Sequence, residues 1–394
     1  MEKKQAVWIG SVLGLGIMVI ATPALFKVLM KRGLEERIAN LKKEGIELQF
    51  VKDKSGYFQT DRIYQFRVKR DGEEWKGVVE IQYLNLPITS VDLNWTISQY
   101  TPPMEEPPAL THLKIQLWQG MRGRASSRDL QHFTYQIEPI KKPDLNLSQV
   151  RGKLYLESKE KYSYQMGLDK LSLQLGDLTG IVTNYEQANQ IEPKQTKIHA
   201  KGNFTFQSGE VKLYLGNLVR NSTIYAREPL LSGDTQLLFS TFQLEIPGRK
   251  FVATDGEIDV KLKNCPVELV TQPGIGMGDQ ILKRFGQNRT AMEWRIKLGQ
   301  TALNGEQLGD AGSKMGLVCA SIPNYELAPC NLHLQYRGSV KFTQNIVTPM
   351  LGVTPLQKYI PLLFQKEGDY YKLSFTLDGV SGQIKLNNKP LLSF

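Results

Sequence analysis

The sequence has few of the residues that catalytic and metal sites use most often. Its 394 residues include three cysteines and four histidines, which are His112, His132, His199 and His333. The chain has no H-E-x-x-H, G-x-S-x-G or G-x-x-x-x-G-K-[ST] segment, so the usual signatures of a metallopeptidase, an α/β-hydrolase and a P-loop are missing. We therefore expect a protein that is not an enzyme and has no cofactor or catalytic residues. A hydrolase with carboxylates assembled from distant segments is the alternative.

The cysteines are too few for a disulfide framework or a zinc cluster. Cys319 and Cys330 flank a proline-containing segment whose length suits a loop between two strands, and Cys265 has no obvious mate. A Cys319–Cys330 disulfide is expected if this part of the chain is extracytoplasmic, and three reduced thiols are expected otherwise. No metal is expected, because Cys330 and His333 lack a second pair of ligands.

Dense runs of one charge are also missing. The formal net charge is +10; residues 1–45 hold eight Lys or Arg and four Asp or Glu, which leaves +6 spread over the rest of the chain. Such thin positive charge is compatible with an anionic lipid surface but is not the footprint of a nucleic-acid-binding protein.

One long apolar run is present, at the start of the chain. Ala6 to Phe26 are 21 residues without a charge, flanked by lysines on both sides. As a helix they would be about 30 Å long, the thickness of a bilayer's hydrocarbon core. We predict a transmembrane anchor within residues 1–30. A cleavable signal peptide is the alternative, although the small-residue cleavage site is poor.

The hydrophobic period changes after the anchor. Residues 31–45 place Leu34, Ile38 and Leu41 at helical intervals, which predicts a juxtamembrane helix. From Ile46 the period is two, so residues 46–394 are expected to be a β-rich body. The proline-rich stretch 101–108 is a candidate boundary within that body.

A short pattern recurs along the body: a glycine followed by apolar residues two and four positions later. It is typical of a turn glycine that opens a strand with one apolar and one polar face. It begins at Gly77, Gly152, Gly202, Gly209, Gly256, Gly338 and Gly382. Few helices are expected, and the best candidates are 278–285 and 343–364, the second interrupted by prolines. The predicted fold class is mainly β: a transmembrane helix, then a large antiparallel, curved sheet with few helices.

Half-apolar strands must hide one face. A sealed sandwich satisfies this requirement and is the commoner arrangement, while an open sheet would satisfy it by binding lipid chains. The candidate lipid-facing residues are Val211, Leu213, Leu215, Ile258, Val260 and Leu262. On the opposite side of one of these strands, Asp255, Glu257 and Asp259 indicate either a solvated face or a calcium site.

Both ends of the chain resemble the YdgA-like family of bacterial envelope proteins of unknown function. The segment from Ser55 to Thr60 (Ser-Gly-Tyr-Phe-Gln-Thr) resembles the family's small-Gly-aromatic-aromatic opening, with Thr60 in place of the usual serine. Residues 368–371 and 382–390 resemble its closing strand pair, with Asn388 where a glycine is common. The resemblance implies a single-pass inner-membrane protein with a cytoplasmic N-terminus and a periplasmic body, and no assigned catalytic residues.

The anchor followed by amphipathic strands also resembles, in architecture alone, the AsmA and TamB type of proteins, which carry phospholipid along an apolar groove. We therefore expect a membrane-anchored, non-enzymatic envelope protein that binds lipid or helps to transport it on an apolar sheet face. The expected partner is membrane lipid. The alternative is a scaffold or assembly factor whose partners are other envelope proteins.

Overall fold

The computed structural model describes Glu35, Ile38, Lys42 and most of residues 45–394. Within that range it leaves out 57, 71, 86–89, 105, 159, 228–229, 267–284, 320–328, 353–359 and 394. The predicted anchor at 1–30, most of the predicted helix at 31–45 and most of that at 278–285 therefore lie outside the described residues. None of the helices in the described part is long and apolar enough to span a membrane.

The chain divides into two compact units, Met1–Gly176 and Asp177–Phe394. The proline-rich stretch 101–108 lies inside the first unit, where it connects a strand to a helix. In both units the strands are antiparallel and helices are few, so the prediction of a mainly β, antiparallel body with few helices is confirmed.

The first unit is an antiparallel meander in which each strand pairs with the next one along the chain. After β5 this order is interrupted by two short strands, β7 and β8, which pair with each other. The longer strands on either side of them, β6 and β9, also pair with each other. The strands are β1 (Ile46–Ser55), β2 (Gln59–Arg70), β3 (Glu73–Leu84), β4 (Val91–Thr101), β5 (Arg122–Ser127), β6 (His132–Ile137), β7 (Ile140–Lys142), β8 (Leu145–Leu147), β9 (Val150–Leu156) and β10 (Tyr162–Leu175).

A helix covers part of the apolar face of this first sheet. Helix α2 (Pro108–Trp118) begins with a proline, whose missing N–H costs nothing in a first turn. Its Leu117 and Trp118 pack on the buried Ile97, Met121 and their neighbours. This sheet thus hides apolar surface beneath a helix, as a half-apolar sheet requires.

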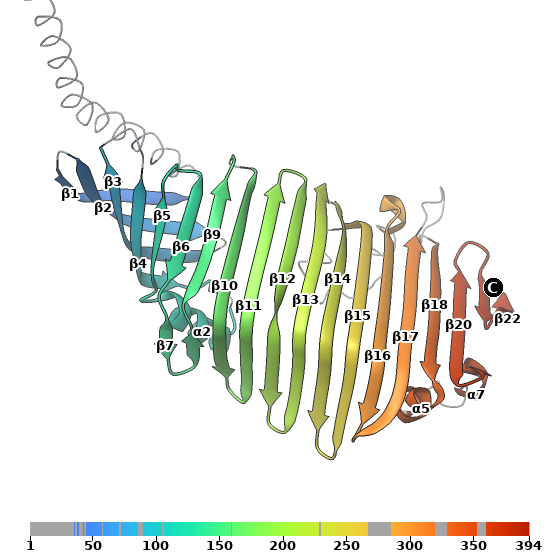
Figure 1. The fold of residues 1–394 in the computed structure, drawn as a ribbon. Helices are drawn as coiled ribbons and strands as arrows, with labels where there is room; N and C mark the ends of the chain where they lie inside the picture. Colours follow the sequence, from blue (N-terminus) through green and yellow to red (C-terminus); the bar gives the residue numbers. More distant parts are fainter. Residues whose placement is uncertain are drawn as a thin grey trace, which may run out of the picture. The chain divides into compact units, whose positions relative to one another are not determined.

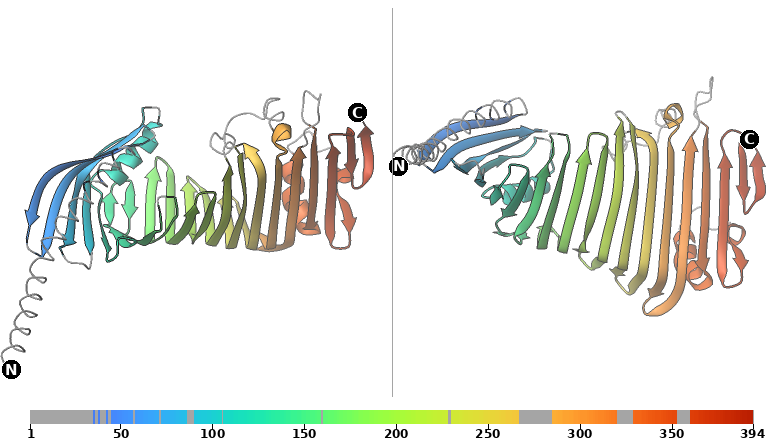
Figure 2. Two further views of the ribbon diagram at one scale, coloured as in Figure 1. Left: turned by 90° about the horizontal axis from the view of Figure 1, so that it is seen from above. Right: turned by 45° about the horizontal axis from the view of Figure 1, so that its top comes forward.

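The second unit is also a meander, and its strands lie side by side in one layer (Figures 1 and 2). β20 pairs with β18 on one edge and with β19 and β21 on the other. The strands are β11 (Leu178–Glu192), β12 (Gln195–Ser208), β13 (Val211–Arg227), β14 (Leu230–Ile246), β15 (Arg249–Pro266), β16 (Ala291–Leu303), β17 (Glu306–Cys319), β18 (Cys330–Ser339), β19 (Gln365–Glu367), β20 (Tyr370–Asp378), β21 (Gln383–Leu386) and β22 (Lys389–Ser393).

Short helices connect β18 to β19, in the region where the sequence predicts a proline-interrupted helix at 343–364. They are α5 (Val340–Phe342), the π-helix η1 (Thr343–Val347), α6 (Thr348–Gly352) and α7 (Ile360–Leu363). The first begins three residues earlier than predicted because Ser339 caps it: the Ser339 Oγ accepts a hydrogen bond from the Phe342 N–H at 3.1 Å.

Left-handed residues bend several strands of the second unit at corresponding positions. Asn184, Asn217 and Asp255 have φ angles of 52°, 49° and 51°. Asn184 and Asn217 lie at register shifts in the β11–β12 and β12–β13 pairs. The Asn217 N–H donates to the Asn203 Oδ1 at 2.7 Å, which fixes this bend across two strands. Such bulges shift the alternation of side chains by one residue.

Cys319 and Cys330 form a disulfide at the end of the β17–β18 pair where the chain passes from one strand to the next. They are the pair that the sequence spacing indicated. The third cysteine, Cys265, is a buried free thiol beside Phe285, and burial raises its pKa.

Candidate functional site

The strand register of the second unit places apolar side chains from all its long strands on one face of the sheet. Residues paired across an antiparallel ladder share a face. One row of paired residues runs Leu213–Leu244–Phe251–Leu303, and another runs Leu237–Ile258–Ile296. The two rows belong to the same face, because the Phe239 and Phe242 rings meet across the bend with centroids 6.2 Å apart. We refer to this surface as the apolar face.

All six predicted lipid-facing residues lie on the apolar face, in two groups. Val211, Leu213 and Leu215 lie at the start of β13, before its bend, and Val211 is 43% exposed. The other three, Ile258, Val260 and Leu262, lie after the bend of β15 and are half-buried. The structure thus brings onto one face two groups of residues that the sequence placed on separate strands.

Described residues seal this face in two places. Phe342 of α5 packs with Leu308 and Ala311 over one part, and its ring contacts that of Phe251. Phe285 packs with Met292 and the disulfide over another. Leu262, one of the six candidates, contacts this second cluster and so faces protein on one side.

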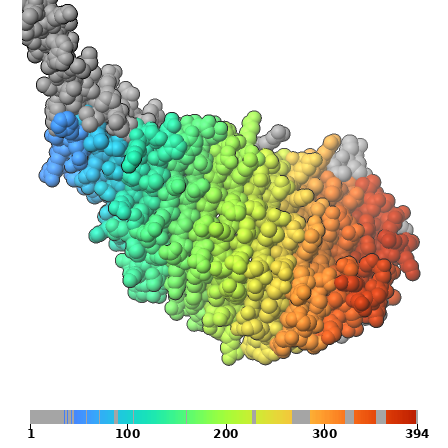
Figure 3. All heavy atoms as spheres, in the orientation of Figure 1, coloured from blue at the N-terminus to red at the C-terminus, as the bar shows by residue number. Residues whose placement is uncertain are grey.

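Both places lie over β15–β17. Beside them, the face over β11–β14 has no second layer among the described elements, which pack there mainly on neighbouring strands. Phe206, Val211 and Ile246 remain 38%, 43% and 39% exposed there, and Ile296 of the neighbouring β16 is 40% exposed. All four share the face. Figure 3 shows the side chains of adjacent strands packed closely together over the visible side of the sheet. A contiguous apolar surface of this kind is unusual for a protein surface and marks a binding site or an interface.

A group of polar side chains on β13 and β14 interrupts the apolar face. Arg220 of β13 pairs with Ala200 and Leu237, so it lies on this face, and it is exposed. Its Nε donates to the Ser222 Oγ at 2.9 Å, and the Thr235 Oγ1 donates to the same oxygen at 3.0 Å. We refer to Arg220, Ser222 and Thr235 as the polar island. Among the described residues, no carboxylate forms an ion pair with Arg220.

Sequence reasoning missed the polar island. The alternation Val211–Leu213–Leu215 predicts odd-numbered residues of this strand on the apolar side. The bend at Asn217 shifts the alternation, so that the even-numbered Leu218, Arg220 and Ser222 continue the face. The one signal in the sequence was Gly216-Asn217, a pair that favours a bulge.

The opposite face of the sheet is polar, and ion pairs cross it. The Lys297 Nζ donates to the Glu257 Oε2 at 3.1 Å, and this hydrogen bond is the main reason why the pKa of Glu257 is lowered. The Asp259 Oδ2 lies 4.0 Å from the Arg295 Nη1. Two of the three carboxylates considered as a calcium site are thus paired with cations, and the described residues include no cluster of three or more His, Cys, Asp or Glu that could hold a metal.

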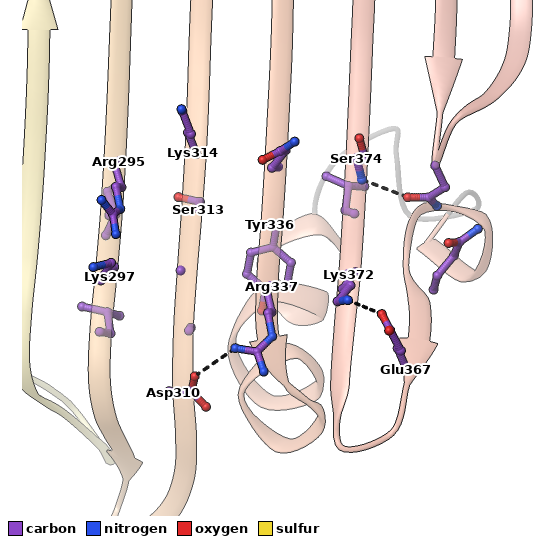
Figure 4. Close-up of a pocket in the computed structure, with 18 of the residues that line it drawn as sticks. Arg295, Lys297, Asp310, Ser313, Lys314, Tyr336, Arg337, Glu367, Lys372 and Ser374 are labelled. Atoms are coloured by element: carbon purple, nitrogen blue, oxygen red, sulfur yellow. Dashed lines mark hydrogen bonds and ion pairs between the residues drawn. The ribbon is translucent and has the colours of Figure 1, made fainter.

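A hollow of about 830 Å³ lies over β16–β20 (Figure 4). It is lined by the cations Arg295, Lys297, Lys314, Arg337 and Lys372 and by carboxylates that include Asp310 and Glu367. Each of the five cations has a carboxylate within 4.0 Å, so the hollow offers alternating charge rather than an unpaired one. We therefore regard the apolar face as the stronger candidate site.

Comparisons with protein-family models, with curated proteins and with solved structures found no match to this chain.

Proposed function

We propose that this chain is a non-enzymatic, membrane-anchored envelope protein that binds the apolar chains of lipids on the apolar face of its second unit, and so helps to hold or transport them. The observation that supports the proposal is the part of the apolar face over β11–β14, which no described element covers. Lipid chains would remove this surface from water, with a gain of about 25 cal/mol for each Å² buried.

Site-specific photo-crosslinking in intact membranes tests this proposal. A photoreactive amino acid at Leu213 or Val260 should capture lipid, because both positions belong to the apolar face. Lys212 and Lys261 are matched controls, since each is the chain neighbour of a tested residue and points to the polar face. Capture of lipid at neither test position, or equal capture at test and control positions, would contradict the proposal.

The proposed location is the bacterial inner membrane, with the N-terminus cytoplasmic and the body periplasmic. It rests on the 21-residue uncharged run and on the resemblance to envelope proteins. Protease added to spheroplasts should digest the body while leaving cytoplasmic marker proteins intact. Protection of the body until the membrane is lysed would reverse the proposed orientation.

A scaffold role is the second candidate, and strand β1 favours it. Among the described strands β1 pairs only with β2, and its Phe50 and Val51 are 53% and 51% exposed. A free apolar strand edge can accept a strand from another protein. Affinity purification from solubilised membranes should then recover a defined partner that Phe50→Lys loses and that the polar-face variant Lys212→Ala retains.

A further inference from the structure

Arg220 is an unusual residue for its place in the sheet. Among the paired residues of the described strands, the interior of the apolar face carries this one charged side chain; other charges on the face, such as Arg249, lie at hairpin ends. Cations on the polar face form cross-strand ion pairs, but none of the described carboxylates pairs with Arg220. Arg220 is exposed, but its charge would become costly to bury if lipid covered this face without bringing an opposite charge.

The neighbours of Arg220 hold its guanidinium in place without neutralising it. Ser222 is 4% exposed, and its Oγ accepts hydrogen bonds from the Arg220 Nε and the Thr235 Oγ1. The Nε is therefore occupied, while no described group accepts a hydrogen bond from the two terminal nitrogens of Arg220. Two parallel N–H donors of a planar guanidinium match the oxygens of a phosphate.

Apolar residues continue directly from Arg220 across the sheet. Leu237, Ile258 and Ile296 follow it in one cross-strand row, and Ile296 is 40% exposed. With strands about 4.8 Å apart, this row extends roughly 14 Å from the guanidinium. A cation at one end of an apolar row is complementary to an amphiphile with an anionic head and an apolar tail.

We propose that Arg220 binds the phosphate of a phospholipid headgroup, with Ser222 and Thr235 orienting the guanidinium, while the lipid chains lie along the row that begins at Leu237. This inference rests on the proposed function and adds to it the class of lipid: one whose headgroup carries an accessible phosphate. The contact between Arg220 and the phosphate would also fix the position of the bound lipid on the apolar face.

Binding of two fluorescent lipids to the purified full-length protein in non-ionic detergent tests the inference. The probes are a phosphatidylglycerol and a diacylglycerol with the same labelled chain, so that they differ only in the phosphate headgroup. Wild-type protein should bind the phosphatidylglycerol more tightly. Arg220→Gln should weaken that binding about tenfold, which corresponds to one charge-assisted hydrogen-bonded contact, and leave diacylglycerol binding unchanged.

Two variants serve as controls. Arg220→Lys keeps the charge and should retain part of the preference for phosphatidylglycerol. Arg295→Gln removes an arginine from the polar face and should change neither affinity.

Three results would overturn the inference, and they have different meanings. If Arg220→Gln binds both probes as the wild type does, the headgroup site is wrong while lipid binding on the face stands. If it weakens both probes equally, Arg220 supports the fold rather than the headgroup. If neither probe binds the wild type, the proposed function itself fails.

Discussion

At the scale of single residues, glycines that lie beneath aromatic rings shape this sheet. A Cβ atom at Gly256 would lie 1.8 Å from the ring of Phe239, its cross-strand partner on the apolar face. Phe239 is only 6% exposed because its ring fills the space that a side chain at Gly256 would occupy. The glycine is needed here for close approach and not for a left-handed backbone.

Gly256→Ala should therefore lower the free energy of unfolding by roughly 1–3 kcal/mol, the usual cost of overpacking. Gly312→Ala is the matched control: its Cβ would lie 3.2 Å from the Ile296 carbonyl oxygen and meet no ring, so its loss of stability should be clearly smaller than that of Gly256→Ala. Urea unfolding of both variants measures these changes in the free energy of unfolding. The same measurement on Gly256→Ala in a Phe239→Leu background tests whether the Phe239 ring causes the loss. Equal losses at the two glycines would show that the ring is not the cause.

At the scale of elements, a partly buried polar contact attaches α2 to the first sheet. The Lys114 Nζ of α2 donates to the Glu73 Oε1 of β3 at 2.7 Å, and the Tyr100 hydroxyl of β4 donates to the same oxygen at 3.0 Å. The Tyr100 ring also contacts the rings of Trp75 and Trp118, which contact each other. Burial, with a smaller contribution from the hydrogen bond to Glu73, raises the pKa of Tyr100 to about 12.

This pKa predicts a loss of stability at high pH. An unfolded tyrosine loses its proton near pH 10, so between about pH 10 and 12 the folded state binds more protons than the unfolded state. Stability from Tyr100 is thus fully present below pH 10 and decreases as the pH rises through 12. Urea unfolding at pH 8, 10 and 11 should show a steeper decrease for the wild type than for Tyr100→Phe. Parallel pH profiles would argue against the raised pKa.

At the scale of the whole molecule, the question is whether the apolar face of the second unit is open. Two leucines on that face allow an open position to be compared with a sealed one. Leu237 of β14 is half-buried, whereas Leu308 is 2% exposed and packs against Phe342. A polar side chain of equal size is tolerated where water reaches it and costly where it does not.

Leu237→Asn should lower the free energy of unfolding by less than about 1 kcal/mol, and Leu308→Asn by about 3 kcal/mol or more. Denaturant unfolding of the full-length protein in detergent, without added lipid, measures both changes. A large loss at Leu237 would mean that a sealed core covers it, and would weaken the case for lipid on this face.

The sequence by itself determined the local features of this protein. Alternation with a period of two identifies strands and separates an apolar from a polar side, because both properties depend on residues two positions apart. The antiparallel, helix-poor body followed from this pattern, as did the six candidate residues on strand faces. The spacing of Cys319 and Cys330 indicated the pair that the structure joins.

Only the tertiary structure decided which local faces belong together and what covers them. The bends at Asn217 and Asp255 shift the alternation, so Val211–Leu215 and Ile258–Leu262 meet on one face, and Arg220 comes to lie among apolar residues. The sealing of Leu308 by Phe342 and the exposure of Ile296 likewise depend on partners far away in the sequence. The register between strands and the elements that cover a sheet face depend on contacts between distant residues, which a pattern of neighbouring residues cannot specify.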